Sequence, residues 1–211
     1  MQTITLISTV HKETGNCNAK ELCKIIEKLS PDVIFLEALE DTYKAYDVQR
    51  FSSYGIYHTK LEIKALQLYS QIASFDYVPV LDDGLSDAFE NKFNLVCIDH
   101  EFQTIVDNYN SLAICNGFKF LNSKESRNLQ DEMRKFENHY FNGSEIEIEF
   151  NKSIDIYENA MIANIYSYCK KNHFNNAIFL CGVAHRKSII EKIEKFQSNE
   201  EIKINWKFYT D

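Results

Sequence analysis

Short runs of apolar and β-branched residues alternate with segments of helical periodicity along most of this 211-residue chain. This alternation is typical of strands that are followed by helices, and it predicts a three-layer α/β structure with a mainly parallel sheet. Strands are expected at residues 3–9, 33–36, 77–81, 177–181 and 202–208. The chain length favours one domain over residues 1–211.

Two local signals suggest the order of the five strands. Pro79 cannot donate a ladder hydrogen bond, so the third strand is expected at one edge of the sheet. Residues 202–208 alternate between apolar and polar side chains, which favours the opposite edge for the fifth strand. Right-handed crossovers with the first strand in the centre then predict the order 3-2-1-4-5. Residues 84–149 are expected to form a helical insertion or lid after the third strand.

Composition and charge exclude several classes of protein. The chain has 23 basic and 31 acidic side chains, a net charge of -8, and no block of Lys or Arg, so a nucleic-acid partner is not expected. No apolar run approaches the roughly 18 residues that suggest a membrane span, so no membrane partner is expected either. The N-terminus lacks the pattern of a secretory signal, and the six cysteines form no CxxC pair. We therefore expect a cytoplasmic protein with reduced thiols.

Ionisable side chains follow each of the first four predicted strands. His11 lies just past the first strand, Glu37 closes the second, Asp82 follows the third and His185 follows the fourth. Neighbouring strands are about 4.8 Å apart, so the carboxyl ends of parallel strands would bring these groups into one patch. Each residue alone is also typical of an ordinary cap or turn. Their convergence is the observation that favours a functional site.

A long helix is expected from about residue 152 to residue 171, and its apolar face contains Glu158. A carboxylate on a buried face needs a partner. Two partners remain open: a Lys or Tyr in a structural pair, or a site histidine that Glu158 would orient. We favour the histidine, and we interpret the neighbouring Tyr157 as a core residue.

Several common catalytic motifs are absent from the sequence. Neither GxGxxG nor GxxxxGK[ST] occurs, which removes support for a nucleotide cofactor. The segment that begins at His100 lacks the second His of HExxH, and no GxSxG is present. The site at the strand ends therefore has no standard phosphate cradle, zincin helix or nucleophile elbow.

The residues at the strand ends nevertheless resemble a known superfamily. It unites erythromycin-esterase-like proteins, ChaN-like haem-binding proteins, and the TraB, PrgY and Tiki proteins, and its signature is a pair of GxxH motifs with a Glu that ends the second strand. The similar segments are Ser8-Thr9-Val10-His11, Pro31–Glu37, Val78–Asp82, the helix positions Glu158, Met161 and Asn164, and Gly182-Val183-Ala184-His185. Ser8 replaces the first Gly of one motif, and Tyr157 stands where the helix motif usually has Arg.

This resemblance and the strand-end residues together favour a hydrolase of an ester or a peptide. In that hypothesis His11 or His185 removes a proton from water, Glu37 holds the imidazole, and Arg186 is an oxyanion partner. A metal-dependent version uses the same atoms, with His11, Glu37 and His185 as ligands of a divalent ion. The cofactor is then a divalent metal ion, and the partner is a small-molecule or peptide substrate.

The alternative is a ligand-binding or signalling module without catalysis. The Tyr-rich segment from Tyr43 to Tyr57 and the helical insertion could line a pocket for an apolar ligand. The resemblance to the haem-binding branch suggests haem as one such ligand.

Overall fold

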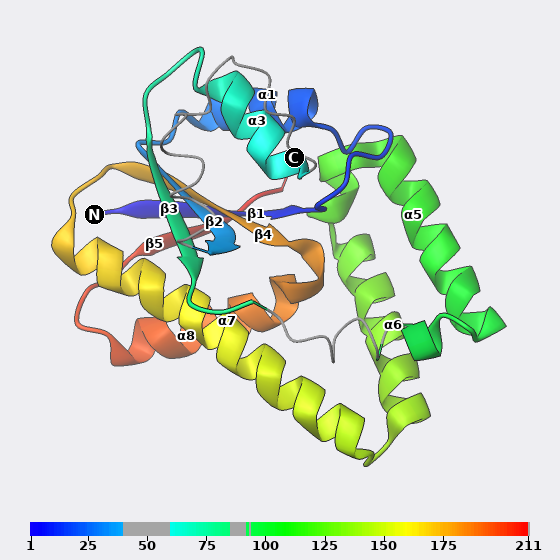
Figure 1. The fold of residues 1–211 in the computed structure, drawn as a ribbon. Coiled ribbons are helices and arrows are strands. Elements are labelled where there is room, and N and C mark those ends of the chain that lie inside the picture. Colours follow the sequence, from blue (N-terminus) through cyan, green and yellow to red (C-terminus); the bar gives the residue numbers. More distant parts are fainter. Residues whose placement is uncertain (40–59, 85–91, 93, 211) are drawn as a thin grey trace.

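The computed structural model describes residues 1–39, 60–84, 92 and 94–210. A five-stranded sheet runs through the centre, and all of its neighbouring strands are parallel (Figure 1). Its strands are β1 (Thr3–Thr9), β2 (Val33–Leu39), β3 (Asp76–Leu81), β4 (Asn176–Gly182) and β5 (Asn205–Phe208). The α/β class, the parallel sheet and the two edge strands are confirmed.

The strand order differs from the predicted one. The order is β3-β2-β4-β1-β5, so β4 lies between β1 and β2 instead of outside β1. Both orders keep β3 and β5 at the edges and leave the apolar central strands covered on both faces. The hydrophobic pattern therefore fits both orders equally, and only the backbone pairing of β4 with both β1 and β2 distinguishes them.

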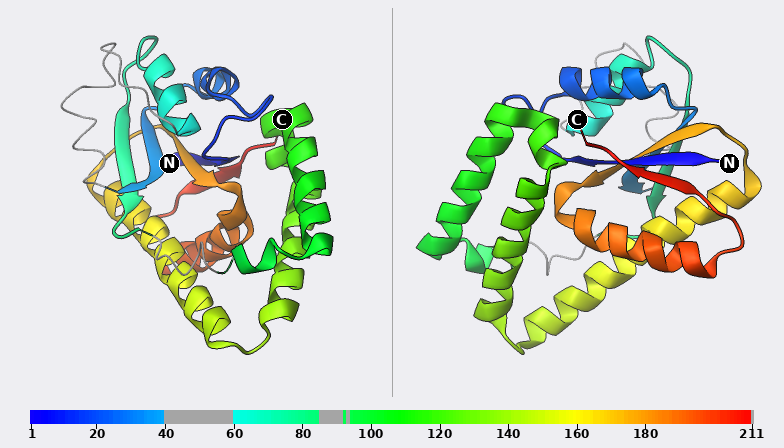
Figure 2. Two further views of the ribbon diagram at one scale, coloured as in Figure 1. Left: turned by 45° about the vertical axis from the view of Figure 1, so that its right-hand side comes forward. Right: turned by 180° about the vertical axis from the view of Figure 1, so that it is seen from behind.

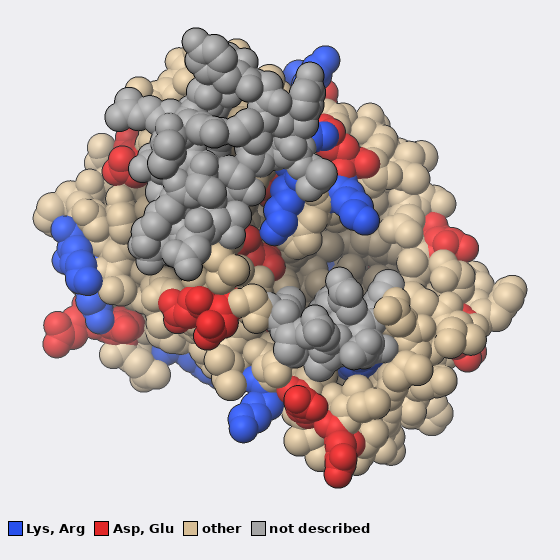
Figure 3. Space-filling view, viewed as in Figure 1, with Lys and Arg blue, Asp and Glu red and all other residues tan. Residues whose placement is uncertain are grey.

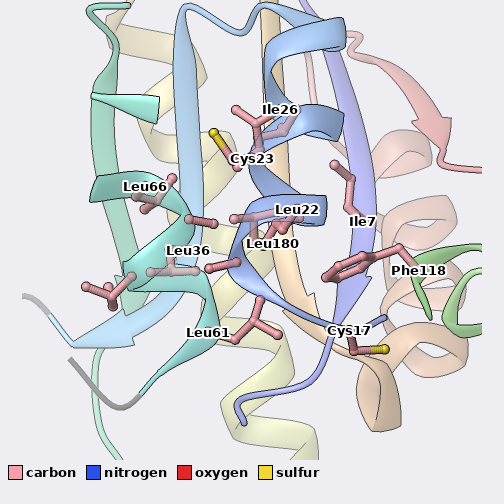
Figure 4. Close-up of a cluster of buried hydrophobic side chains, with 14 of the residues drawn as sticks. Ile7, Cys17, Leu22, Cys23, Ile26, Leu36, Leu61, Leu66, Phe118 and Leu180 are labelled. Carbon is pink, nitrogen blue, oxygen red and sulfur yellow. The ribbon is translucent and has the colours of Figure 1, made fainter. Parts of the chain in front are cut away.

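Helices cover both faces of the sheet (Figures 1 and 2). One face carries α1 (Ala19–Leu29) and α3 (Leu61–Tyr69), and the other carries α7 (Glu145–Lys171) and α8 (Arg186–Asn199). Alternate residues of each strand point to opposite faces. Accordingly, Leu36 packs with α1 and α3 in the cluster of Figure 4, whereas Phe35 packs with α7 and α8.

Polar caps set the ends of two of these helices. Asn18 precedes α1 and accepts a hydrogen bond from the Glu21 backbone N–H at 3.1 Å. Ser144 accepts a hydrogen bond from the Glu147 backbone N–H in the same way, so α7 begins at Glu145 and not near residue 152 as predicted. The helix is therefore long enough to extend from the sheet into the insertion.

In its described part the insertion is helical, as expected, and includes α5 (His100–Leu121), α6 (Lys124–Phe141) and the first turns of α7. Figure 2 shows α5 and α6 beyond the ends of the strands, outside the two layers that cover the sheet. None of the helices in the described ranges combines the length and apolar character needed to cross a membrane.

The inner end of the insertion is fixed to the sheet. Asn122, which follows α5, is buried; its side chain accepts a hydrogen bond from the Ser8 backbone N–H at 2.8 Å and donates one to the Ser8 carbonyl at 3.1 Å. Gly117 bends α5 with a φ of 57°, and a Cβ there would lie 2.8 Å from the Asn16 carbonyl oxygen. The loop after His11 therefore packs directly against the bend of α5.

We expect Gly117→Ala to destabilise the protein by about 1–3 kcal/mol, because the backbone at this position is one that L side chains rarely adopt. Urea unfolding monitored by circular dichroism measures this change. Gly84→Ala is the control, because a Cβ at Gly84 would have no neighbour within 4 Å among the residues that the structure describes. It should change stability by less than about 0.5 kcal/mol. Equal effects of the two substitutions would contradict the proposed contact.

Candidate functional site

The end of β4 is the point where the candidate residues meet. A Cβ on Gly182 would lie 3.2 Å from Glu37 Oε2, 3.5 Å from His185 Cδ2 and 3.6 Å from His11 Nε2. Because β4 lies between β2 and β1, its last residue has Glu37, near the end of β2, on one side. On the other side lies Thr9, the last residue of β1, with His11 just beyond it. The structure therefore brings His11, Glu37 and His185 together around a glycine.

Glu37 is the central carboxylate of this group. It is buried, and it accepts hydrogen bonds from the Gly182 backbone N–H at 2.7 Å and from the Tyr157 hydroxyl at 2.8 Å. Burial acts to raise the pKa of Glu37, but the nearby His185 and the N–H of Gly182 together lower that pKa below its ordinary value. Glu37 is therefore a fixed negative charge at neutral pH.

His185 is held by a second buried carboxylate. Its Nδ1 lies 2.9 Å from Glu158 Oε1, and its Nε2 lies 3.6 Å from Glu37 Oε1. Glu158 is fully buried on α7, and its other oxygen accepts a hydrogen bond from the Ser188 hydroxyl. The structure thus pairs Glu158 with a site histidine, and the buried Lys192 Nζ also lies 3.9 Å from Glu158 Oε2. Glu37, in contrast, lies beyond hydrogen-bonding distance of that ring.

His11 is held in the same way by Glu62, a residue that the sequence analysis missed. Glu62 lies on α3 and is 2% exposed; its Oε1 is 3.1 Å from His11 Nδ1 and accepts a hydrogen bond from the Thr9 hydroxyl at 2.7 Å. Leu61 and Ile63 flank it, so a carboxylate in an apolar stretch was the available signal. Its Oε2 is buried and has no hydrogen-bond partner among the residues that the structure describes.

The contact with Glu62 shifts the titration of His11. The hydrogen bond from its ring to Glu62 raises the pKa of His11 above its ordinary value, and this effect outweighs the opposing effect of burial. A raised histidine pKa stabilises the folded state fully at pH values below the ordinary value of about 6.5. That stabilisation is lost as the pH rises through the raised pKa of His11.

Tyr157 has a polar role that differs from its interpretation as a core residue. Its hydroxyl donates to Glu37, and its ring lies 5.5 Å from the ring of His185 between centroids. Burial raises the pKa of Tyr157, so the phenol remains a neutral donor. The sequence could not show this hydrogen bond, because a Tyr on an apolar helix face is as typical of a ring packed in the core as of a hydroxyl that binds a site residue.

Two predicted site residues lie outside this group. Asp82 is exposed, accepts a hydrogen bond from Asn164 at 2.8 Å, and lines a hollow beside α7. Arg186 is buried and donates hydrogen bonds to the Ser8 hydroxyl at 3.0 Å and to Asn122 at 2.8 Å. Adjacent residues at the start of a helix point in different directions, so His185 reaches the carboxylates whereas Arg186 reaches β1. Burial lowers the pKa of Arg186 to about 10.

The site lies between two cavities. One has a volume of about 280 Å³ and is lined by His11, Glu37, Lys60, Glu62 and Tyr157, together with apolar residues. The other has a volume of about 320 Å³ and extends from His185 between α5, α6 and α7. Figure 3 shows a hollow on this side of the molecule, next to the insertion. The segment from Tyr43 to Tyr57, which was expected to line a ligand pocket, lies outside the described residues.

The predicted metal ligands were His11, Glu37 and His185. Within residues 1–39, 60–84, 92 and 94–210, no three or more His, Cys, Asp or Glu side chains form a group that could hold a metal ion. Both Nδ1 atoms face carboxylates, a pairing that is found in catalytic bases and in metal-ligating histidines alike. These residues thus provide two imidazole rings, each oriented by a carboxylate.

No family model, curated protein or solved structure matches this chain.

We expect Glu62→Gln to lower the pKa of His11, because the neutral amide removes the charged hydrogen-bond partner that raises it. The pH titration of the His11 imidazole resonances by NMR measures the shift. Glu13→Gln is the matched control, because Glu13 lies close in sequence but pairs with Lys64 and the Ala19 backbone N–H. An unchanged His11 titration in Glu62→Gln would show that this pair does not control the imidazole.

Proposed function

We propose that this protein is a hydrolase that activates water with a carboxylate-oriented histidine and cleaves an ester or a peptide. The observation that carries the proposal is the pair of imidazoles at the ends of β1 and β4. Each has its Nδ1 within 3.1 Å of a buried carboxylate, and the ionised Glu37 lies between them. Carboxylate–imidazole pairs of this kind fix the tautomer of a general base and stabilise the imidazolium that forms during catalysis.

His11 is the better placed base. Its ring is half exposed, it lines the cavity of about 280 Å³, and its Nε2 is the ring nitrogen left for water because Nδ1 is bound to Glu62. In the proposed reaction His11 Nε2 takes a proton from water, and the resulting hydroxide attacks the carbonyl carbon. Glu62 stabilises the positive charge on the ring.

His185 is the proposed acid. In the proposed step the ring starts as the imidazolium: Glu158 holds Nδ1–H, and Nε2–H gives its proton to the leaving group when the carbonyl carbon–oxygen or carbon–nitrogen bond breaks. The proton that His11 took from water then returns to His185 Nε2 through solvent, which restores both rings. Glu37 Oε1 lies 3.6 Å from this Nε2. Tyr157 keeps the Glu37 carboxylate in place.

The resemblance to the erythromycin-esterase-like, ChaN-like and TraB, PrgY and Tiki proteins is part of the proposal. It is supported by the convergence of His11, Glu37 and His185, which carry the resemblance. Both departures from the pattern have partners here, since Ser8 binds Arg186 and Tyr157 binds Glu37. All six cysteines are free, which supports our proposal of a reducing, cytoplasmic location.

We expect His11→Ala to lower kcat/KM for p-nitrophenyl ester hydrolysis by about 100- to 10,000-fold, because general-base catalysis contributes a factor of this size. Asp82→Asn is the control, because Asp82 also follows a strand but is exposed and binds Asn164. It should retain activity within about twofold. Comparable losses in both variants, or full activity in His11→Ala, would contradict the assigned base.

We propose the metal-free form of this reaction because the described residues lack a group of ligands for an ion. Activity is therefore expected to survive dialysis against EDTA, with no gain when Zn²⁺ or Mn²⁺ is added. The esterase assay before and after dialysis, with metal analysis of the same sample, measures this. Loss of activity that an added ion restores would instead favour the metal-dependent form.

A further inference from the structure

The larger of the two cavities at the site lies within the helical insertion. It has a volume of about 320 Å³, which is at the lower end of the range for small-molecule sites. His185 and Ala184 form its wall towards the sheet, and α5, α6 and α7 form the rest. A molecule in this cavity would lie directly against the imidazole that Glu158 orients.

Apolar side chains form much of the surface that a ligand would contact. Phe102 and Val106 come from α5, Met133 comes from α6, and Phe150 and Ile154 come from α7. Phe102 is fully buried and Phe150 is partly buried, so aromatic carbon lines the interior. Transfer of an apolar group from water to such a surface is favourable by about 25 cal/mol per Å² of buried area.

The remaining polar lining is mostly uncharged. Amide side chains are contributed by Asn110, Gln130, Asn138 and Asn151. Asn110, Asn138 and Asn151 are exposed, so they lie towards the mouth of the cavity and not at its base. Amide side chains can donate hydrogen bonds to an uncharged polar group of a ligand and accept hydrogen bonds from it.

The charged lining residues already have partners within the protein. Lys92 Nζ lies 3.2 Å from Glu137 Oε2 and 3.9 Å from the centre of the Phe150 ring. Arg134 donates a hydrogen bond to the Ala184 carbonyl at 3.0 Å. Glu137 is paired with Lys92, and the guanidinium of Arg134 is exposed, so the interior offers no unpaired charge among the described lining residues. A charged ligand group buried in this mainly apolar interior is therefore unfavourable.

We propose that this cavity binds an uncharged, apolar group, and that under the proposed function this group is the acyl or aryl part of the substrate next to His185. The cavity of about 280 Å³ on the other side of the site, which contains Glu37, Lys60 and Glu62, then faces the polar part of the substrate. The inference rests on the proposed hydrolase only where it identifies the bound group as part of the substrate. Binding of the apolar group itself requires no turnover.

Two dyes that differ by one charge test the binding. N-phenyl-1-naphthylamine is uncharged, and 1-anilinonaphthalene-8-sulfonate has the same rings with an added sulfonate. Fluorescence titration of the full chain should show saturable binding of the uncharged dye, with a Kd at least about tenfold lower than that of the sulfonate. Tighter binding of the sulfonate would overturn the proposal and indicate an anion site at Arg134.

Filling the cavity locates the bound dye. Ile154→Trp places a large ring in the lining and should weaken binding of the uncharged dye at least about tenfold. Ile148→Trp is the matched control, because Ile148 is on the same helix but is 64% exposed. Asn151→Trp blocks the mouth from an exposed position, so it keeps the test decisive if Ile154→Trp does not fold. Unchanged binding in a folded Ile154→Trp would overturn the proposal. If Ile154→Trp does not fold, unchanged binding in Asn151→Trp would overturn it.

Ester hydrolysis separates this inference from the proposed function. If both hold, Ile154→Trp should raise KM for p-nitrophenyl hexanoate about tenfold more than KM for p-nitrophenyl acetate. Cavity-dependent dye binding by a chain without hydrolytic activity would support the apolar site and refute the hydrolase. Hydrolysis with the same hexanoate-to-acetate ratio of KM in wild type and Ile154→Trp would refute the placement of the acyl group in this cavity and leave the hydrolase intact.

Discussion

The hydrogen bond from the Gly182 backbone N–H to Glu37 Oε2 connects the ends of β4 and β2, and the candidate site is built around it. A Cβ on Gly182 would lie 3.2 Å from that oxygen and 3.6 Å from His11 Nε2, so the absence of a side chain lets three chain segments approach. The contact also fixes an ionised carboxylate between two imidazoles. Because β4 lies between β1 and β2, this arrangement follows directly from the strand pairing.

Burying three carboxylates at one edge of the sheet is unfavourable unless each has partners, and the protein supplies them from different elements. Glu37 binds a backbone N–H and a phenol, Glu62 binds a hydroxyl and His11, and Glu158 binds a hydroxyl and His185. The two imidazoles are therefore oriented by α3 and α7, which cover opposite faces of the sheet. Proper packing of both layers is thus required for the geometry of the site.

The insertion is part of this framework at its inner end. Asn122 binds the backbone of Ser8 and the guanidinium of Arg186, and Gly117 packs against the loop that follows His11. Ser8 uses its hydroxyl to accept a hydrogen bond from Arg186. The helices that form the larger cavity are consequently anchored to the same strand end that carries His11.

The sequence by itself determined the α/β class, the positions of the strands, the two edge strands and the idea that His11, Glu37 and His185 meet, because hydrophobic periodicity and the residues after each strand are local properties. It also identified Glu158 as a buried carboxylate. Only the tertiary structure decided that β4 lies between β1 and β2, that Glu62 holds His11, and that Asp82 and Arg186 point elsewhere. The physical reason is that strand pairing and side-chain direction depend on contacts between residues far apart in the chain, and several arrangements bury the same apolar pattern equally well.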